Sequence, residues 1–404
     1  MFFRKTKPNR GLSPGTIAWR KFRKNYSAFF ALLWILLFVV IAFLGYTVAP
    51  DPTPMANRQN LSIATMSPGF SSTFLIKRMD IQQQEKQSWF SVMLFGKTSV
   101  HDWLPISDYS FSADSIVVEY YKEDPRAQGV IASFALADVL FPSDSSGVKD
   151  GVIVNYSEGH ATDRLKIGEA RSEIEKQHLV DKTFWLGTDR FGRDMLSQLI
   201  IGARISLSVG FIAITIALLV GMVLGSLAGF YRGKTDAFIV WLINVVWSIP
   251  TLLLVIAITF ALGKGFWQIF IAVGLTMWVD VARIVRGQII SVRENEFVEA
   301  GKALGLTSSR IILKHIIPNI MGPVIVISAA NFASAILIEA GLSFLGVGVQ
   351  PPMPSWGSMI RENYGYIILD KAFLAIIPGL AIMLLVMSFM LVGNGLRDAM
   401  EKRY

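Results

Sequence analysis

One short polar segment of this chain has the residue types of a docking surface, and it lies between two strongly apolar segments. Residues 296–305 combine two glutamates, small residues and a closing glycine. Their spacing predicts a helix that ends at Gly305, because glycine readily adopts the left-handed conformation that closes helices. A second helix is expected to start at Thr307 or Ser308 and to stop near Pro318. A helix of about nine residues is marginal alone in water, so we expect this hairpin to dock on a soluble partner.

The first helix is expected to carry a stripe with bulky ends and a small centre. At helical spacing, the stripe consists of Phe297, Ala300, Gly301 and Leu304. Such a stripe fits insertion into a groove. Glu296 and Glu299 lie beside it, where Glu299 can contact a basic rim or pair with Lys302. The alternative is a plain turn between two membrane spans.

Composition indicates a membrane protein. Of 404 residues, 52% are hydrophobic and 17% are charged, whereas soluble domains carry roughly 25% charged residues. A spanning helix needs about 20 mostly apolar residues, and the sequence predicts six. The uncharged blocks that predict them are 27–49, 205–230, 237–263, 265–279, 320–338 and 372–396.

Charge predicts the orientation. Residues 1–26 form a basic amphipathic lead with eight Lys or Arg and no acid, and basic flanks stay in the cytoplasm. Six spans then place both termini and the loop 291–319 in the cytoplasm. Residues 51–204 fall outside with 20 acids against 16 bases. The net charge of +8 therefore reflects topology, and we expect no nucleic-acid partner. The block 27–49 is too long for a cleaved signal peptide and is interpreted as a signal anchor.

Residues 50–183 are expected to form an inserted extracytoplasmic domain of mixed α/β structure. Strands are predicted at 115–121, 130–141 and 151–156, and a helix at 161–178. The stretch 51–110 shows no clean period, and part of it is expected to be loop or a surface-lying helix. The chain has no cysteine, so no disulfide supports this domain.

Ionisable and polar residues in or near the spans are candidates for function, because they are costly in lipid. Glu339 either lines the outer mouth of a pathway or makes a structural hydrogen bond at a subunit contact. Asn331 is the other pathway candidate. Asp280 and Arg283 are expected to form an ion pair, with a gate as the alternative. The charged cluster 189–194 either seats an interfacial helix or touches a substrate-delivering protein.

Glycine and proline predict how the spans pack and bend. Gly221, Gly225 and Gly229 recur every four residues, a spacing that lets two helices approach closely within lipid. Pro250 and Pro378 lie inside predicted spans and are expected to kink them.

No catalytic, metal or cofactor site is predicted. The four histidines are scattered along the sequence at His101, His160, His178 and His315. Residues 229–235 are one residue short of a phosphate loop and end a span instead of following a strand. We therefore expect no ATP hydrolysis by this chain.

Several further motifs accompany the hairpin, among them Leu186-Gly187-Thr188-Asp189 and Gln350-Pro351-Pro352-Met353. The full set of matching runs is 19–25, 49–52, 186–194, 202–207, 282–288, 339–346, 350–357 and 395–399. On these runs the chain resembles the C-type permease subunit of dipeptide/oligopeptide/nickel ABC importers. The resemblance covers roughly residues 15–52 and 184–404.

The resemblance implies an all-α polytopic membrane protein with six transmembrane helices in the type I ABC importer permease architecture. Residues 184–404 would form a five-helix core in the bacterial inner membrane. The residues it implies for coupling to an ATPase are Glu296, Glu299, Ala300, Gly301, Gly305 and Pro318. The implied partners are a second homologous permease subunit, two ATP-binding subunits or domains, an extracytoplasmic substrate-binding protein and the lipid bilayer. Peptides are the expected cargo, ahead of nickel complexes.

The sequence departs from that family at two places and also allows two alternative functions. The family usually has alanine at Gly301, so the hairpin here is expected to be more mobile. The family also has a shorter connection where residues 50–183 stand. The alternatives are a secondary transporter, which needs ionisable residues deep in its spans, and a membrane-anchored sensor or enzyme that works through residues 51–200.

Overall fold

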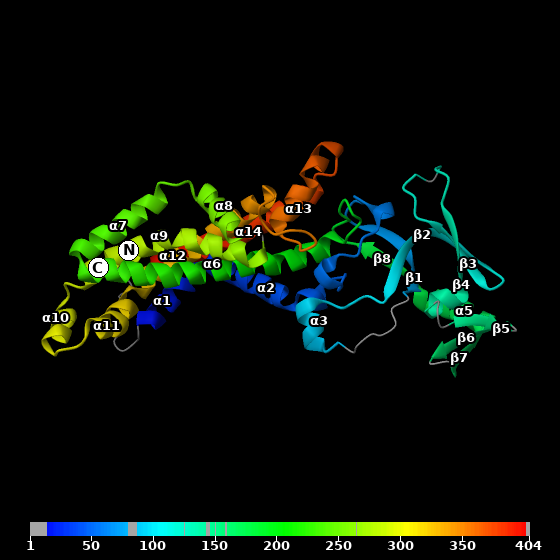
Figure 1. Ribbon diagram of the computed structural model, residues 1–404, viewed down its shortest axis with the longest axis horizontal. Helices are drawn as coiled ribbons and strands as arrows, with labels where there is room; N and C mark the ends of the chain where they lie inside the picture. The colour runs from blue at the N-terminus through cyan, green and yellow to red at the C-terminus, as the bar shows by residue number, and fades with distance from the viewer. Residues whose placement is uncertain are drawn as a thin grey trace, which may run out of the picture.

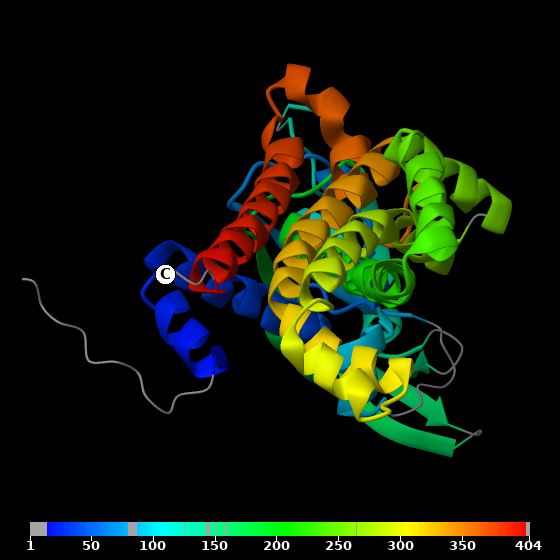
Figure 2. The ribbon, with the colours of Figure 1, turned by 90° about the vertical axis from the view of Figure 1, so that its left-hand side faces the viewer.

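The computed structural model describes residues 14–79, 87–124, 126–142, 146–149, 151–157, 160–263 and 265–400. Part of the predicted basic lead, with Arg4, Lys5, Lys7 and Arg10, lies outside these ranges. The described chain is elongated, with a bundle of long helices at one end and two β-sheets at the other (Figure 1). The hairpin predicted from residues 296–318 lies at the end of the bundle farthest from the sheets. Figure 2 looks onto that end and shows the hairpin in yellow.

The bundle is built from long apolar helices. They are α2 (Tyr26–Val48), α6 (Met195–Tyr231), α9 (Phe266–Val292), α12 (Ile317–Phe344) and α14 (Phe373–Met400), with shorter α1 (Pro14–Phe22) and α13 (Trp356–Asn363). Within the described residues, five helices are long and apolar enough to cross a membrane, or up to six if one bent pair counts as a span.

The bent pair replaces the third predicted span. Residues 237–263 are split into α7 (Gly233–Trp247) and α8 (Thr251–Leu262), which meet at 95°. Pro250 is the N-cap of α8. Proline has no amide hydrogen and disfavours a helical conformation in the residue before it. The kink predicted at Pro250 is therefore a full break, whereas Pro378 lies inside α14.

The glycine stripe of α6 packs against α9, as the spacing predicts. A Cβ atom added at Gly221 would lie 2.6 Å from the Cβ of Val281, and one at Gly225 would lie 2.6 Å from the carbonyl oxygen of Ala282. A Cβ atom at Gly229 would lie 2.9 Å from the carbonyl oxygen of Arg286, also in α9. Any larger residue at these positions would push the two helices apart.

All strands of the described chain lie within residues 70–184, here called the β region. A five-stranded antiparallel sheet has the order β4-β3-β2-β1-β8, and a three-stranded sheet has the order β5-β6-β7. The strands are β1 (Phe70–Arg78), β2 (His101–Ser112), β3 (Ser115–Tyr120), β4 (Ile131–Ala135), β5 (Ser146–Lys149), β6 (Val152–Ser157), β7 (His160–Lys166) and β8 (Leu179–Phe184). Short helices α3 (Trp89–Phe95), α4 (Leu136–Leu140) and α5 (Ile167–Glu173) accompany them.

The strand predictions at 115–121 and 151–156 are confirmed by β3 and β6, but two others need correction. The predicted strand 130–141 ends early, because residues 136–140 form α4. The helix predicted at 161–178 is wrong over its first six residues, which belong to β7 and pair with β6. Its charged residues favoured a helix locally, whereas sheet pairing with a neighbouring strand decides the conformation.

Candidate functional site

The hairpin forms at the end of α9, as helix α10 (Glu296–Ala303) followed by α11 (Ser308–Ile311). Gly305 has φ +74°, so the predicted left-handed closure is confirmed. The amide of Leu306 donates to the carbonyl of Gly301 at 3.1 Å, and that of Gly305 donates to Lys302 at 2.9 Å. These two bonds satisfy carbonyls that a helix end leaves open.

The exposed face of α10 contains only part of the predicted stripe. Phe297, Ala300 and Leu304 are exposed, with Leu304 at 79%. Gly301 is buried, and so is Val298 three residues earlier; both lie on the face of α10 opposite these exposed residues. The prediction that Gly301 belongs to the exposed stripe is therefore wrong. An added Cβ at Gly301 would be 3.6–3.8 Å from Leu306 and Ile311, which is ordinary van der Waals contact.

The charged residues of α10 also differ from expectation. Glu299 and Lys302 form no ion pair in the described structure, and the Lys302 ammonium lies 5.9 Å from the centre of the Phe230 ring at the end of α6. Glu296 and Glu299 are both exposed. Their carboxylates are therefore available to a cationic partner surface.

The second arm of the hairpin does not stop at Pro318. Residues Ile312–Ile316 form a single turn of π-helix, and Pro318 falls in the first turn of α12, where its missing amide hydrogen is tolerated. Ser308–Phe344 reads as one apolar helix. Buried Val298 and Ile311 also join the core cluster of the bundle. A displacement of the hairpin would therefore pass directly into α12.

Ion pairs join the ends of neighbouring helices beside the hairpin. The Arg286 guanidinium binds both oxygens of Asp236, at 2.5 and 2.7 Å, and links α9 to α7. The predicted Asp280–Arg283 pair is absent from the ion pairs of the described residues. Arg283 instead stacks on the Trp247 ring at 3.7 Å. Asp280 lines a groove of about 390 Å³ between the α7–α8 break, α9 and α12.

The two predicted pathway residues are both buried. Glu339 is fully buried and accepts hydrogen bonds from Ser343 at 2.7 Å and from Ser206 of α6 at 3.4 Å. The side-chain amide of Asn331 donates to the carbonyl of Met277 in α9 at 3.5 Å. Neither residue lines a described pocket. This geometry favours the structural interpretation of Glu339.

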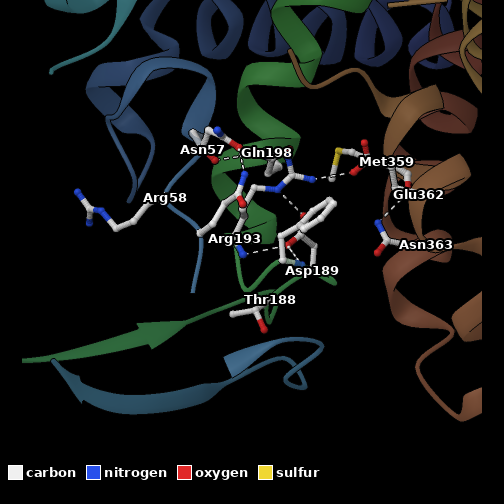
Figure 3. Close-up of polar contacts among 12 residues, drawn as sticks. Asn57, Arg58, Thr188, Asp189, Arg193, Gln198, Met359, Glu362 and Asn363 are labelled. Atoms are coloured by element: carbon white, nitrogen blue, oxygen red, sulfur yellow. Dashed lines mark hydrogen bonds and ion pairs between the residues drawn. The ribbon is translucent and has the colours of Figure 1, made fainter. Parts of the chain in front are cut away.

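A second polar site, here called the clasp, joins three segments at the start of α6 (Figure 3). Arg193 donates from Nε to Asp189 Oδ2 at 2.6 Å and from Nη2 to Glu362 Oε2 of α13 at 2.7 Å. It also reaches Asn57, which follows α2, at 3.4 Å. The Arg193 side chain is only 5% exposed. The charged cluster 189–194 thus holds the segments near the β region together, a role that its sequence did not specify.

A second layer of the clasp closes the start of α6. The side chain of Asp194 caps that helix by accepting from the amide and the hydroxyl of Ser197. The Ser197 hydroxyl in turn accepts from the amide of Asp51 at 2.8 Å. Burial raises the pKa of Asp194, and the Ser197 hydrogen bond opposes that rise. Residues that lie about 140 positions apart in the sequence meet here.

Comparison with known families gives two matches. Residues 221–404 match the model described as "Binding-protein-dependent transport system inner membrane component", and residues 13–68 match "N-terminal TM domain of oligopeptide transport permease C". The matched ranges contain the hairpin and α2.

Curated relatives extend these matches. The dipeptide transport system permease protein DppC of Alkalihalophilus pseudofirmus is 38% identical over 68% of this chain and 84% of its own length. The oligopeptide transport system permease protein OppC of Bacillus subtilis is 39% identical over 55% of this chain and 72% of its own length. A solved inward-facing MetNI methionine ABC transporter is 19% identical, covering 52% of this chain and 98% of that one, with a TM-score of 0.44.

Proposed function

Because this chain belongs to the family of binding-protein-dependent transport system inner membrane components, we propose that it is the membrane-spanning permease subunit of an ATP-driven peptide importer. The observation that carries the proposal is its match to 84% of a dipeptide permease at 38% identity. Peptide cargo also agrees with the names of further relatives, although glutathione permeases are among them.

We propose a type I arrangement with six spans, in which α7 and α8 form one broken span. The hairpin, α1 and the end of α14 lie at the same end of the molecule, opposite the β region (Figure 1). This arrangement agrees with cytoplasmic termini and with an inserted extracytoplasmic domain made by the β region. A second homologous permease, two ATP-binding subunits and a substrate-binding protein complete the assembly, and this chain hydrolyses no ATP.

Force from ATP would enter through the hairpin. The exposed apolar residues Phe297 and Leu304 flank the small Ala300, a shape that fits a groove on an ATPase. Glu299 has no ion-pair partner in the described structure and is available to a basic rim. Since the second arm runs into α12, movement of the ATPases would rock that helix and change the side to which the pathway opens.

The groove at Asp280 is the proposed pathway wall. Asp280 is its one charged lining residue in the described structure, accompanied by Thr276 and Ser334. A carboxylate there would bind a cationic group such as a peptide amino terminus. Asn331 and Glu339 would support the pathway indirectly, by holding α12 against α9 and α6.

Co-purification tests the coupling assignment. A tagged chain, purified from the membranes of its native cells, is expected to retain an ATPase. Glu299→Lys is expected to lose it, because a positive charge would then face the proposed basic rim. Glu175→Lys makes the same charge change at an exposed position of the β region and should retain the ATPase. Retention of the ATPase by Glu299→Lys at the wild-type level would remove Glu299 from the interface.

A further inference from the structure

Helix α3 belongs to the β region by sequence but leaves its sheets. Its seven residues, Trp89–Phe95, include no charged side chain, and Trp89, Phe90 and Phe95 are largely exposed. It lies beside the end of α2 that is nearest the β region (Figure 1). Three exposed aromatic side chains on so short a helix would be unfavourable in water.

The contacts of Arg204 set the depth of α3. From α6, this guanidinium donates to the carbonyls of Ala42 and Phe43 in α2, each at 3.0 Å. It also donates to the carbonyls of Met93 and Leu94 in α3, at 2.9 and 2.7 Å. The carboxyl end of α3 is therefore tied to the same arginine as Ala42 and Phe43, which lie six and five residues before α2 ends at Val48.

The chain after α3 gives the opposite limit. Gly96 has φ +85°, and an added Cβ would lie 2.9 Å from Pro54. The amide of Lys97 donates to the carbonyl of Pro52 at 2.7 Å. Pro52 lies four residues after the end of α2 at Val48. The chain therefore passes from the level of Phe43 to a point beyond α2 within a few residues. Helix α3 is thus confined to the boundary of the apolar layer.

An apolar groove runs from α3 along the outer surface of the bundle. It has a volume of about 700 Å³ and lies between α2, α3 and α6, with Phe332 of α12 and Phe389 of α14 also lining it. Phe43, Phe95 and Phe211 line it from these three helices and remain 59%, 69% and 67% exposed. Among the described residues that line it, Arg204 is the one with a charge, and its guanidinium is occupied by the four carbonyls. The groove is continuous with the lipid-facing side of α2, where Val39 also lines it.

We propose that α3 is an interfacial anchor inserted into the leaflet on the side of the β region, and that the groove beside it holds an acyl chain of a phospholipid. A helix of aromatic and aliphatic residues at this depth has the composition that the headgroup and acyl boundary favours. Arg204 fixes α3 to the bundle, so the β region is held against the membrane surface. The proposal requires only that α2 and α6 span the membrane, and it is independent of cargo and ATPase.

Spin labelling of the full chain in phosphatidylethanolamine and phosphatidylglycerol vesicles tests the anchor. The sequence has no cysteine, so single labels can be introduced cleanly. Phe95→Cys is the test site. The lipid control is Phe211→Cys within α6, and the water control is Val130→Cys on the β region; the native side chains at both control positions are 67% exposed. Collisions with oxygen report lipid, and collisions with a nickel chelate report water.

The collision rates of the label at residue 95 are expected to match those of the label at residue 211, with frequent collisions with oxygen and few with the nickel chelate. A label that behaves like the one at 130 would place α3 in water and overturn the proposal. Protection from both reagents would mean that protein, such as a second permease chain, covers the groove, and would overturn it as well. Arg204→Lys keeps the charge but cannot donate in the same fork, so it should raise nickel collisions at residue 95. No change would remove Arg204 from the positioning role.

Discussion

Replacing Gly301 by alanine is expected to stabilise α10. The added methyl group meets Leu306 and Ile311 at 3.6–3.8 Å, so it fills space without a clash. Alanine gains up to about 1 kcal/mol over glycine in a helix, and burial of one carbon adds at most about 0.8 kcal/mol. The sum of about 1–2 kcal/mol corresponds to roughly a 5- to 30-fold decrease in local opening.

The same substitution at Gly305 provides a matched control. Nothing lies within 4 Å of a Cβ added there, but φ is +74°. A side chain in this left-handed conformation costs about 1–2 kcal/mol, so Gly305→Ala should destabilise the hairpin by a similar amount. The two variants make the same chemical change at positions four residues apart, yet the expected effects have opposite signs.

Amide hydrogen exchange of the full chain, followed on peptides that cover α10, measures both effects. Exchange should slow in Gly301→Ala and accelerate in Gly305→Ala. If Gly301→Ala accelerated exchange, the room assigned to the added methyl group beside Leu306 and Ile311 would be refuted. If Gly305→Ala slowed exchange, the left-handed closure at Gly305 would be refuted.

Three further predictions concern other parts of the chain. Arg193→Met should destabilise the detergent-solubilised protein by about 3–5 kcal/mol, because it removes the ion-pair partner of buried Asp189 and of partly buried Glu362. Arg232→Ala, at an exposed pair, should cost less than about 1 kcal/mol, and equal melting temperatures for the two variants would contradict this ranking. Burial and neighbouring positive charges lower the pKa of His101 below its ordinary value of 6.5, so the β region should be fully stable above that pH and should lose stability as the pH falls. His101→Gln should reduce this loss, measured as the change of melting temperature with pH. An unchanged pH profile would show that His101 is not responsible. In proteoliposomes of the whole transporter, Asp280→Asn should impair uptake of peptides with a free amino terminus more than of acetylated peptides, and equal impairment would remove that contact.

Local patterns determined much of what the sequence predicted. Lipid demands long uncharged helices, so five of the predicted blocks became helices that can span a membrane, and Pro250 broke the remaining one. The left-handed conformation at Gly305 and the close packing at Gly221 likewise follow from the missing side chain of glycine. These features depend on a residue and its near neighbours, and for that reason they could be predicted without the fold.

Tertiary structure decided which partner each polar or ambiguous residue takes. Asp280 lies three positions from Arg283 and six from Arg286, yet Arg286 pairs with Asp236 and Arg283 stacks on Trp247. Gly301 turned inward because Leu306 and Ile311 fold back over it. Such outcomes depend on how separate elements pack against one another, and only the folded arrangement defines the energies of those contacts. The depth of α3 has the same origin, since it follows from one arginine on α6 that no local pattern connects to residues 89–95.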